Sequence, residues 1–166
     1  MGNFTSRIQM VNRSLINLNR VTFVTVFTVT ACLVSISLNI LYSFVNERDI
    51  IWFDFPGFDD GVVLMFFLAV IFAPPFETWL GQSLPYRLLN KVQYLKDRSY
   101  LVLVIGAVWF GINHFYSLFY MIYGFLIGLV FMYGYMVRIK TDKKTFYLIS
   151  ICHSLINLMI FIKNLV

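Results

Sequence analysis

The chain has 166 residues, of which 60% are hydrophobic and 13% are charged, and its formal net charge is +5. A soluble domain has roughly 45–50% apolar residues, and a chain of about 150 residues buries only about 70% of its unfolded surface. Disordered chains, in contrast, have low hydrophobicity. The composition therefore excludes a soluble globular domain and a disordered chain. We expect an all-α, polytopic transmembrane helix bundle in contact with membrane lipid. We expect no nucleic-acid partner, since no basic patch is interleaved with exposed aromatic residues.

The first predicted element is a membrane-spanning helix over residues 21–45, which contain no charged residue. A helix needs about 20 residues to cross the hydrocarbon core. Residues 1–20 carry three arginines and are expected to form an amphipathic lead-in on the cytoplasmic side. Residues 29–32 resemble a lipoprotein cleavage box, but apolar sequence continues after Cys32, so an uncleaved helix is the preferred interpretation.

Three further apolar stretches follow, at residues 61–84, 99–137 and 145–162. The first is interrupted only by Glu77. The second has no Asp, Glu, Lys or Arg, and as a single helix it would be about 58 Å long, against a bilayer core of about 30 Å. We therefore divide it into two spans that meet near residues 115–117. This division predicts about five spans in total.

The loops between these stretches predict the orientation of the chain. Residues 47–60 are mainly acidic, whereas residues 87–98 and 138–144 each carry four basic residues. Basic clusters on alternate loops follow the positive-inside rule. We expect one integral membrane domain, residues 1–166, in the cell membrane, with a cytoplasmic N-terminus and an external C-terminus.

Three titratable side chains stand inside the apolar stretches: Glu77, His114 and His153. Insertion scales put a charged residue at the membrane centre at about 2.5–3.5 kcal/mol, so such residues indicate function or pairing. One carboxylate and two imidazoles can together perform acid–base chemistry on water. Each also has a structural interpretation, since a histidine can bridge two helices and Glu77 can pair with Arg87.

Polar and aromatic neighbours favour a shared site for the histidines. His153 and Asn157 are four residues apart, as are Phe110 and His114, so each pair lies on one helix face. Depth is a difficulty, because His114 is sixteen residues from Arg98, about 24 Å of helix. Glu77 is only about 15 Å of helix from the nearest loop charge.

Two prolines, Pro74 and Pro75, shortly precede Glu77. Because prolines remove backbone donors, we expect the helix to kink or restart there. A restart would put Glu77 in a first turn, where free N–H groups favour a carboxylate. Thr78 and Gln82 are four residues apart and are expected to hydrogen-bond on the adjoining face.

A small-xxx-small pattern, Gly124 and Gly128, lies in the second half of the long charge-free run. Such a pattern lets two helices approach closely, within one chain or between chains. A homo-oligomer that forms through Gly124 and Gly128 is therefore one expectation.

The order of the motifs resembles that of the CPBP intramembrane peptidases, which include the type II CAAX prenyl endopeptidases and the bacteriocin self-immunity (Abi) proteins. The family motifs are Glu-Glu-x-x-x-Arg, Phe-x-x-x-His, and His-x-x-x-Asn or His-x-x-x-Asp. The corresponding segments here, within a motif core at residues 73–157, are Glu77-Thr78-x-x-x-Gln82, Phe110-x-x-x-His114 and His153-x-x-x-Asn157. The chain departs from the first motif, because Thr78 and Gln82 replace the second glutamate and the arginine.

The resemblance implies hydrolysis of a peptide bond in a peptide or protein substrate inside the membrane. Glu77 would take a proton from water, and His114 would orient that water. His153 and Asn157 would stabilise the oxyanion. The supporting residues would be Thr78, Gln82 and Phe110.

Two mechanisms stay open under this resemblance. Glu77, His114 and His153 could hold Zn²⁺ or another divalent metal with water in an open position, or the same residues could act without a metal. We prefer the mechanism without a tightly bound metal. The departure in the first motif weakens any inference that the substrate is prenylated.

A second class of function competes with the peptidase. A non-catalytic immunity or scaffold protein of the same fold would use these polar residues only to hold helices together. A transporter with a proton relay is less favoured, since the five spans show no inverted repeat.

Overall fold

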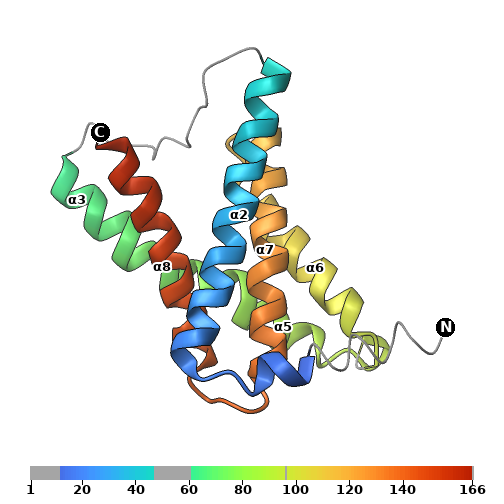
Figure 1. Cartoon of the computed structure of the whole chain (residues 1–166). Helices are drawn as coiled ribbons and strands as arrows, with labels where there is room; N and C mark the ends of the chain where they lie inside the picture. The colour runs from blue at the N-terminus through green and yellow to red at the C-terminus, as the bar shows by residue number, and fades with distance from the viewer. Residues whose placement is uncertain (1–11, 47–60, 96, 166) are drawn as a thin grey trace.

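The computed structural model describes residues 12–46, 61–95 and 97–165. Their regular elements are all helical (Figure 1), which confirms the predicted all-α class. A helical turn at residues 12–16 precedes the first long helix. The elements are α2 (Arg20–Asn46), α3 (Val62–Phe66), η2 (Phe67–Phe72), α4 (Ala73–Thr78), η3 (Trp79–Ser83), α5 (Leu84–Leu89), η4 (Gln93–Leu95), α6 (Ser99–Ile112), α7 (Leu118–Arg138) and α8 (Thr145–Asn164).

Four helices of the described residues are long and apolar enough to cross a membrane, namely Arg20–Phe44, Val62–Leu89, Leu118–Arg138 and Thr145–Asn164. The second of them joins α3, η2, α4, η3 and α5 into one continuous helix, in which η2 and η3 are π-helical. The chain is therefore a multi-pass membrane protein, as predicted. The fifth apolar helix, α6, has 14 residues, about 21 Å, which is less than the bilayer core of about 30 Å.

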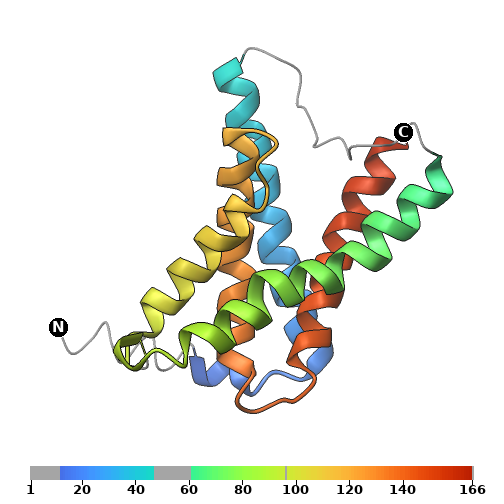
Figure 2. The ribbon, with the colours of Figure 1, turned by 180° about the vertical axis from the view of Figure 1, so that it is seen from behind.

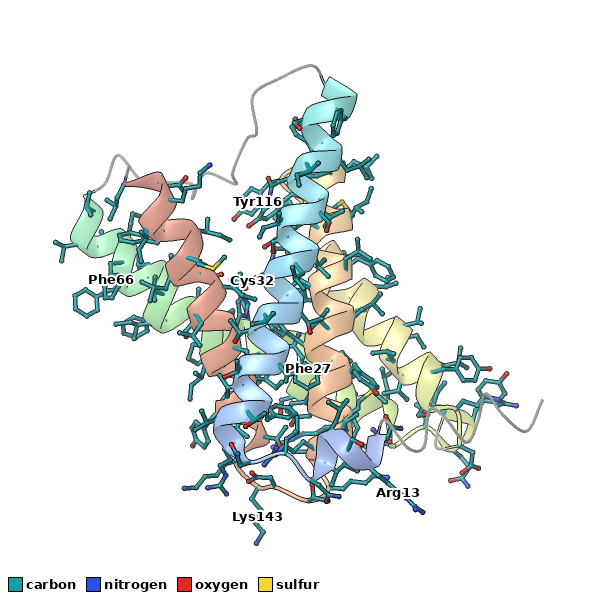
Figure 3. The ribbon with its side chains drawn as sticks, in the orientation of Figure 1. Arg13, Phe27, Cys32, Phe66, Tyr116 and Lys143 are labelled. Atoms are coloured by element: carbon teal, nitrogen blue, oxygen red, sulfur yellow. The ribbon has the colours of Figure 1, made fainter. Side chains whose placement is uncertain are left out.

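The apolar helices run alternately between two ends of the bundle (Figure 1). The end where α2 begins also holds the loop between α7 and α8, because the Arg20 Nε atom lies 2.9 Å from the Asp142 Oδ2 atom. Figure 3 shows Arg13 and Lys143 at this same end. Basic residues thus gather on one side of the bundle, as the positive-inside rule requires. The acidic stretch at 47–60 lies outside the described residues.

Arg138 binds the lead-in segment to this basic end. Its Nη1 donates to the backbone oxygen of Leu18 at 2.9 Å, and its Nη2 donates to Asp142 Oδ2 at 3.4 Å. The Tyr133 hydroxyl donates to Asn12 Oδ1 at 2.7 Å. The described part of the lead-in is therefore packed against the bundle through polar contacts. Residues 1–11 lie outside the described residues.

Helix tilt removes the difference in depth that the sequence predicted for His114. Seen from behind in Figure 2, α6 runs obliquely to α7, and the Val62–Leu89 helix crosses the bundle at a slant. The number of residues along a tilted helix overestimates its depth in the membrane. His114 lies in the turn between α6 and α7, where it can lie at the same depth as Glu77.

The core of the bundle lies where α2, α7 and α8 meet. Its fully buried side chains include Phe23 of α2, Phe131 of α7 and Ile149 of α8. Gly134 of α7 lets α2 approach, because a Cβ atom there would lie 2.7 Å from the Phe27 ring. Many large apolar side chains elsewhere are exposed, among them Phe44 at 80%, as expected of a surface that contacts lipid.

The two glycines of the small-xxx-small pattern pack α7 against α6 inside one chain. A Cβ atom on Gly128 would lie 3.0 Å from Phe110 Cβ, and a Cβ atom on Gly124 would lie 3.2 Å from Gly111 Cα. Two chains that associated through these glycines would therefore have to displace α6 from α7.

Candidate active site

A cavity of about 370 Å³ lies between the Val62–Leu89 helix, the α6–α7 hairpin and α8. Glu77, His114, His153 and Asn157 all line it. The structure thus brings together four polar residues from three separate parts of the chain. Its aromatic lining consists of Phe76, Phe110, Tyr116, Tyr120 and Tyr123.

Glu77 of α4 contacts both histidines through one carboxylate oxygen. Its Oε2 atom lies 3.2 Å from the His153 Nε2 atom and 3.9 Å from the His114 Nε2 atom. Arg87, the ion-pair partner considered for Glu77 from sequence, instead lies on the exposed surface. Glu77 side-chain exposure is 31%, against 14% for His114 and 7% for His153. The carboxylate is therefore the most accessible of the three groups.

A hydrogen bond to the last turn of α6 fixes the orientation of the His114 ring. Its Nδ1 atom lies 2.7 Å from the backbone oxygen of Phe110. A carbonyl oxygen only accepts hydrogen bonds, so Nδ1 carries the hydrogen and the neutral ring presents an acceptor at Nε2. Gly124 provides the space for this ring, because a Cβ atom there would lie 3.0 Å from two ring atoms of His114.

His153 is held among aromatic rings. Its ring centroid lies 5.9 Å from that of Phe110 and 5.1 Å from that of Phe131. The Phe110 ring also lies 4.6 Å from the His114 ring, so one phenyl group packs against both imidazoles. Gly81 on the Val62–Leu89 helix allows this, because a Cβ atom there would collide with the Phe110 ring. Phe110 thus contacts both histidines and the Glu77 helix.

The helix does not restart at the prolines before Glu77, so the predicted first turn at Glu77 is wrong. Phe72 and Trp79, which flank α4, both have right-handed helical backbone angles. The chain accommodates the prolines by a π-helical turn, in which the Ala73 N–H donates to Leu68, five residues earlier. Glu77 therefore lies in the middle of a continuous helix, without the free N–H groups of a first turn.

Each π-helical turn precedes a proline, and in each the proline leaves a carbonyl without its backbone donor. Ala69 would receive the N–H of residue 74 in the π register, but residue 74 is proline, and the Ala73 N–H already donates to Leu68. Asn157 of α8 fills this position, with its Nδ2 donating to the Ala69 oxygen at 2.8 Å. Asn157 therefore binds α8 to the Glu77 helix, a role that its spacing from His153 did not predict.

The second π-helical turn repeats this arrangement. The Leu84 N–H donates to Trp79 rather than to Leu80, and residue 85, which the π register would pair with Leu80, is proline. The indole Nε1 of Trp109 donates to the Leu80 oxygen at 3.2 Å. Sequence reasoning did not identify Trp109. The available signal was the position of the prolines, which indicates unpaired carbonyls but not their donors.

Thr78 and Gln82 do not form the hydrogen bond that their spacing predicted. Both residues are fully buried, and neither Thr78 Oγ1 nor the amide of Gln82 has a hydrogen-bond partner. The π-helical turn η3 begins directly after Thr78, so the α-helical relation between residues four apart does not hold. His153 Nδ1 is a further buried polar atom without a partner.

Comparison with known proteins identifies one family. A family model described as Type II CAAX prenyl endopeptidase Rce1-like matches residues 59–159, which is more than half of the chain. The matched region contains Glu77, His114, His153 and Asn157, and also Trp109. No curated protein and no solved structure matches the chain.

Proposed function

The chain belongs to the type II CAAX prenyl endopeptidase Rce1-like family, as the order of its motifs predicted, and from this premise we propose that it is an intramembrane endopeptidase of the CPBP type. One observation carries the proposal. A single oxygen of Glu77 lies 3.2 and 3.9 Å from two imidazole nitrogens in a shared cavity of a multi-pass membrane protein.

In the proposed reaction, Glu77 accepts a proton from a water molecule whose oxygen attacks the carbonyl carbon of the scissile peptide bond. The neutral His114 ring has an acceptor at Nε2, which can take a second hydrogen bond from the same water. General-base catalysis contributes about 10²–10⁴-fold to the rate. Glu77 then gives the proton to the leaving nitrogen as the C–N bond breaks.

Charge that develops on the carbonyl oxygen needs hydrogen-bond donors. Asn157 donates one amide hydrogen to Ala69, and its second amide hydrogen can serve the oxyanion. His153 Nε2, close to Glu77, can be a second donor. One such donor is worth about 2.7–4 kcal/mol of barrier in other hydrolases.

A metal-dependent mechanism would use Glu77, His114 and His153 as ligands. Among the residues that the structure describes, no group of three His, Cys, Asp or Glu side chains is arranged to hold a metal ion. We therefore derive no step through a metal, and we expect cleavage to continue after treatment with a chelator. Activity that is lost with the chelator and restored by zinc would contradict this part of the proposal.

Glu77→Gln is the decisive variant, because it keeps the shape of the side chain and removes the base. We expect cleavage to fall by about 10²-fold or more, with normal insertion and thermal stability. Asp97→Asn is the matched control, since it makes the same chemical change at an exposed carboxylate. The assay reconstitutes each protein with membrane-protein fragments in vesicles and identifies new termini by mass spectrometry. Wild-type cleavage by Glu77→Gln would refute the proposal.

A non-catalytic immunity or scaffold function is the second candidate. It is favoured by Thr78 and Gln82, which replace the charged residues of the family motif and are buried without partners. If Glu77→Gln accumulates normally and keeps the full cellular effect of the wild type, this candidate replaces the peptidase.

The proposed enzyme lies in the cell membrane with its basic end in the cytoplasm. The contact between Arg20 and Asp142 brings basic segments distant in sequence to one end, and the positive-inside rule assigns that end to the cytoplasm. The N-terminus would then be cytoplasmic and the C-terminus external. The proposed partners are membrane lipid and a peptide or protein substrate.

A further inference from the structure

We propose that Trp109 is a positioning residue of the proposed active site, because its indole N–H stabilises the π-helical turn next to Glu77. The role of Glu77 rests on the proposed function, whereas the geometry rests on separate contacts. Trp109 does not line the cavity. It contacts the Glu77 helix through the 3.2 Å hydrogen bond from its Nε1 to the Leu80 oxygen.

Two donors compete for the Leu80 oxygen. In a regular α-helix the Leu84 N–H would donate to Leu80, four residues earlier. Here the Leu84 N–H donates to Trp79, and Pro85 has no N–H to offer in its place. The indole N–H of Trp109 supplies the donor that the Leu80 oxygen would otherwise lack in the π register. The hydrogen bond from Trp109 therefore favours the π register over the α register.

The register determines where Glu77 points. One residue of an α-helix corresponds to a rotation of about 100°. A change of η3 from the π to the α register would therefore rotate the segment before it relative to α5 by about that angle. Glu77 lies in this preceding segment, whereas His114 and His153 belong to other parts of the chain. Its distances of 3.9 and 3.2 Å to their Nε2 atoms would not survive such a rotation.

Two of the carbonyls that lack a backbone donor at the π turns, Ala69 and Leu80, accept hydrogen bonds from the chain segments that carry the histidines. Trp109 precedes His114 by five residues, and Asn157 follows His153 by four. Hydrogen bonds from Trp109 and Asn157 thus hold the Glu77 segment from both sides. Each hydrogen bond connects the helix that carries Glu77 to a chain segment that carries one of the two histidines.

The indole N–H, rather than the bulk of the ring, distinguishes this position. The Trp109 side chain is 44% exposed, and its α6 neighbours Ile105 and Ile112 are exposed to a similar degree, at 41% and 52%. A position that contacts lipid accepts simple apolar side chains, but an unpaired backbone carbonyl at membrane depth is unfavourable. Removal of the N–H therefore frees the Leu80 oxygen for Leu84.

Trp109→Phe removes the donor and keeps an aromatic ring. Trp79→Phe is the matched control, because Trp79 is 46% exposed on the helix that carries Glu77, and its ring packs against Phe76. We expect Trp109→Phe to lower kcat by about 10–100-fold with little change in KM, since a displacement of about 1 Å can cost about 10²-fold. Trp79→Phe should stay within about twofold of the wild type on both parameters.

A second readout does not depend on activity. The rate at which a carbodiimide modifies Glu77, followed by mass spectrometry, reports the surroundings of the carboxylate. We expect this rate to change at least threefold in Trp109→Phe and to stay unchanged in Trp79→Phe. Trp109→Leu, measured in the same way on the monodisperse fraction, replaces Trp109→Phe if that variant does not accumulate.

The outcomes separate the two proposals. If Trp109→Phe matches Trp79→Phe in kcat and in carbodiimide rate, Trp109 has no positioning role, whatever Glu77 does. If Glu77→Gln keeps wild-type activity, the proposed function fails, and the carbodiimide rate alone then decides whether Trp109 positions Glu77.

Discussion

Gly124→Ala tests whether the close approach of α7 to α6 sets the place of His114. The added Cβ atom would lie 3.0 Å from Cγ and Nδ1 of His114 and 3.2 Å from Gly111 Cα. Carbon atoms pack best at about 3.5–4.0 Å, so the imidazole would have to move by about 0.5 Å or more. The same Nδ1 atom donates to Phe110 at 2.7 Å, and the shift would weaken this bond.

Stability and activity should respond to Gly124→Ala by different amounts. Overpacking costs about 1–3 kcal/mol, while alanine gains about 1 kcal/mol over glycine in helix propensity. The net loss of unfolding free energy should therefore be about 0–2 kcal/mol. The displaced imidazole acts on the reacting water in the proposed mechanism, and we expect kcat to fall by about 10–100-fold.

Gly106→Ala is the control, because it adds the same methyl group to the same pair of helices. Its Cβ atom would meet Met132 Cε at 2.8 Å, but this is the flexible end of a methionine side chain, which can move away. We expect wild-type kcat and equal or slightly higher stability. Thermal unfolding in detergent and cleavage rates measure both properties. Wild-type kcat in Gly124→Ala, with the protein intact, would refute the argument that α7 positions His114.

Two further predictions concern residues outside the proposed chemistry. Gln82→Met should raise the unfolding free energy by about 1 kcal/mol, because the buried amide of Gln82 has no partner; a decrease in thermal stability would show that the amide is satisfied. The second concerns Asp142, whose pKa is held below its ordinary value by hydrogen bonds from the Arg20 side chain and the Lys144 backbone N–H. Its contribution to stability is therefore complete above the ordinary Asp pKa of about 4 and is lost progressively as pH falls below that value towards the lowered pKa. The difference in melting temperature between wild type and Asp142→Asn should be largest at neutral pH and smaller at pH 3, and a difference that does not change with pH contradicts this account.

The sequence alone determined the helical class, the apolar segments and the gathering of basic residues at one end of the bundle. The hydropathy and charge of each residue decide whether it enters the hydrocarbon. This preference does not depend on the tertiary structure, because hydrocarbon disfavours charge in any fold. For the same reason Glu77, His114 and His153 could be identified as the titratable residues within the apolar segments. The turn at residues 113–117 was predicted as well, since the charge-free run is too long for one helix.

Only the tertiary structure decided how the helix around Glu77 continues. The prolines indicated that some carbonyls would lack a donor, but an α-helical break and a π-helical turn are both solutions of that local problem. In the folded chain, donors from other helices reach two of these oxygens, Asn157 at Ala69 and Trp109 at Leu80. The expected first turn at Glu77 and the expected bond between Thr78 and Gln82 failed for one physical reason. A backbone oxygen takes whichever donor the folded chain brings to it, and that donor can lie almost ninety residues away in the sequence.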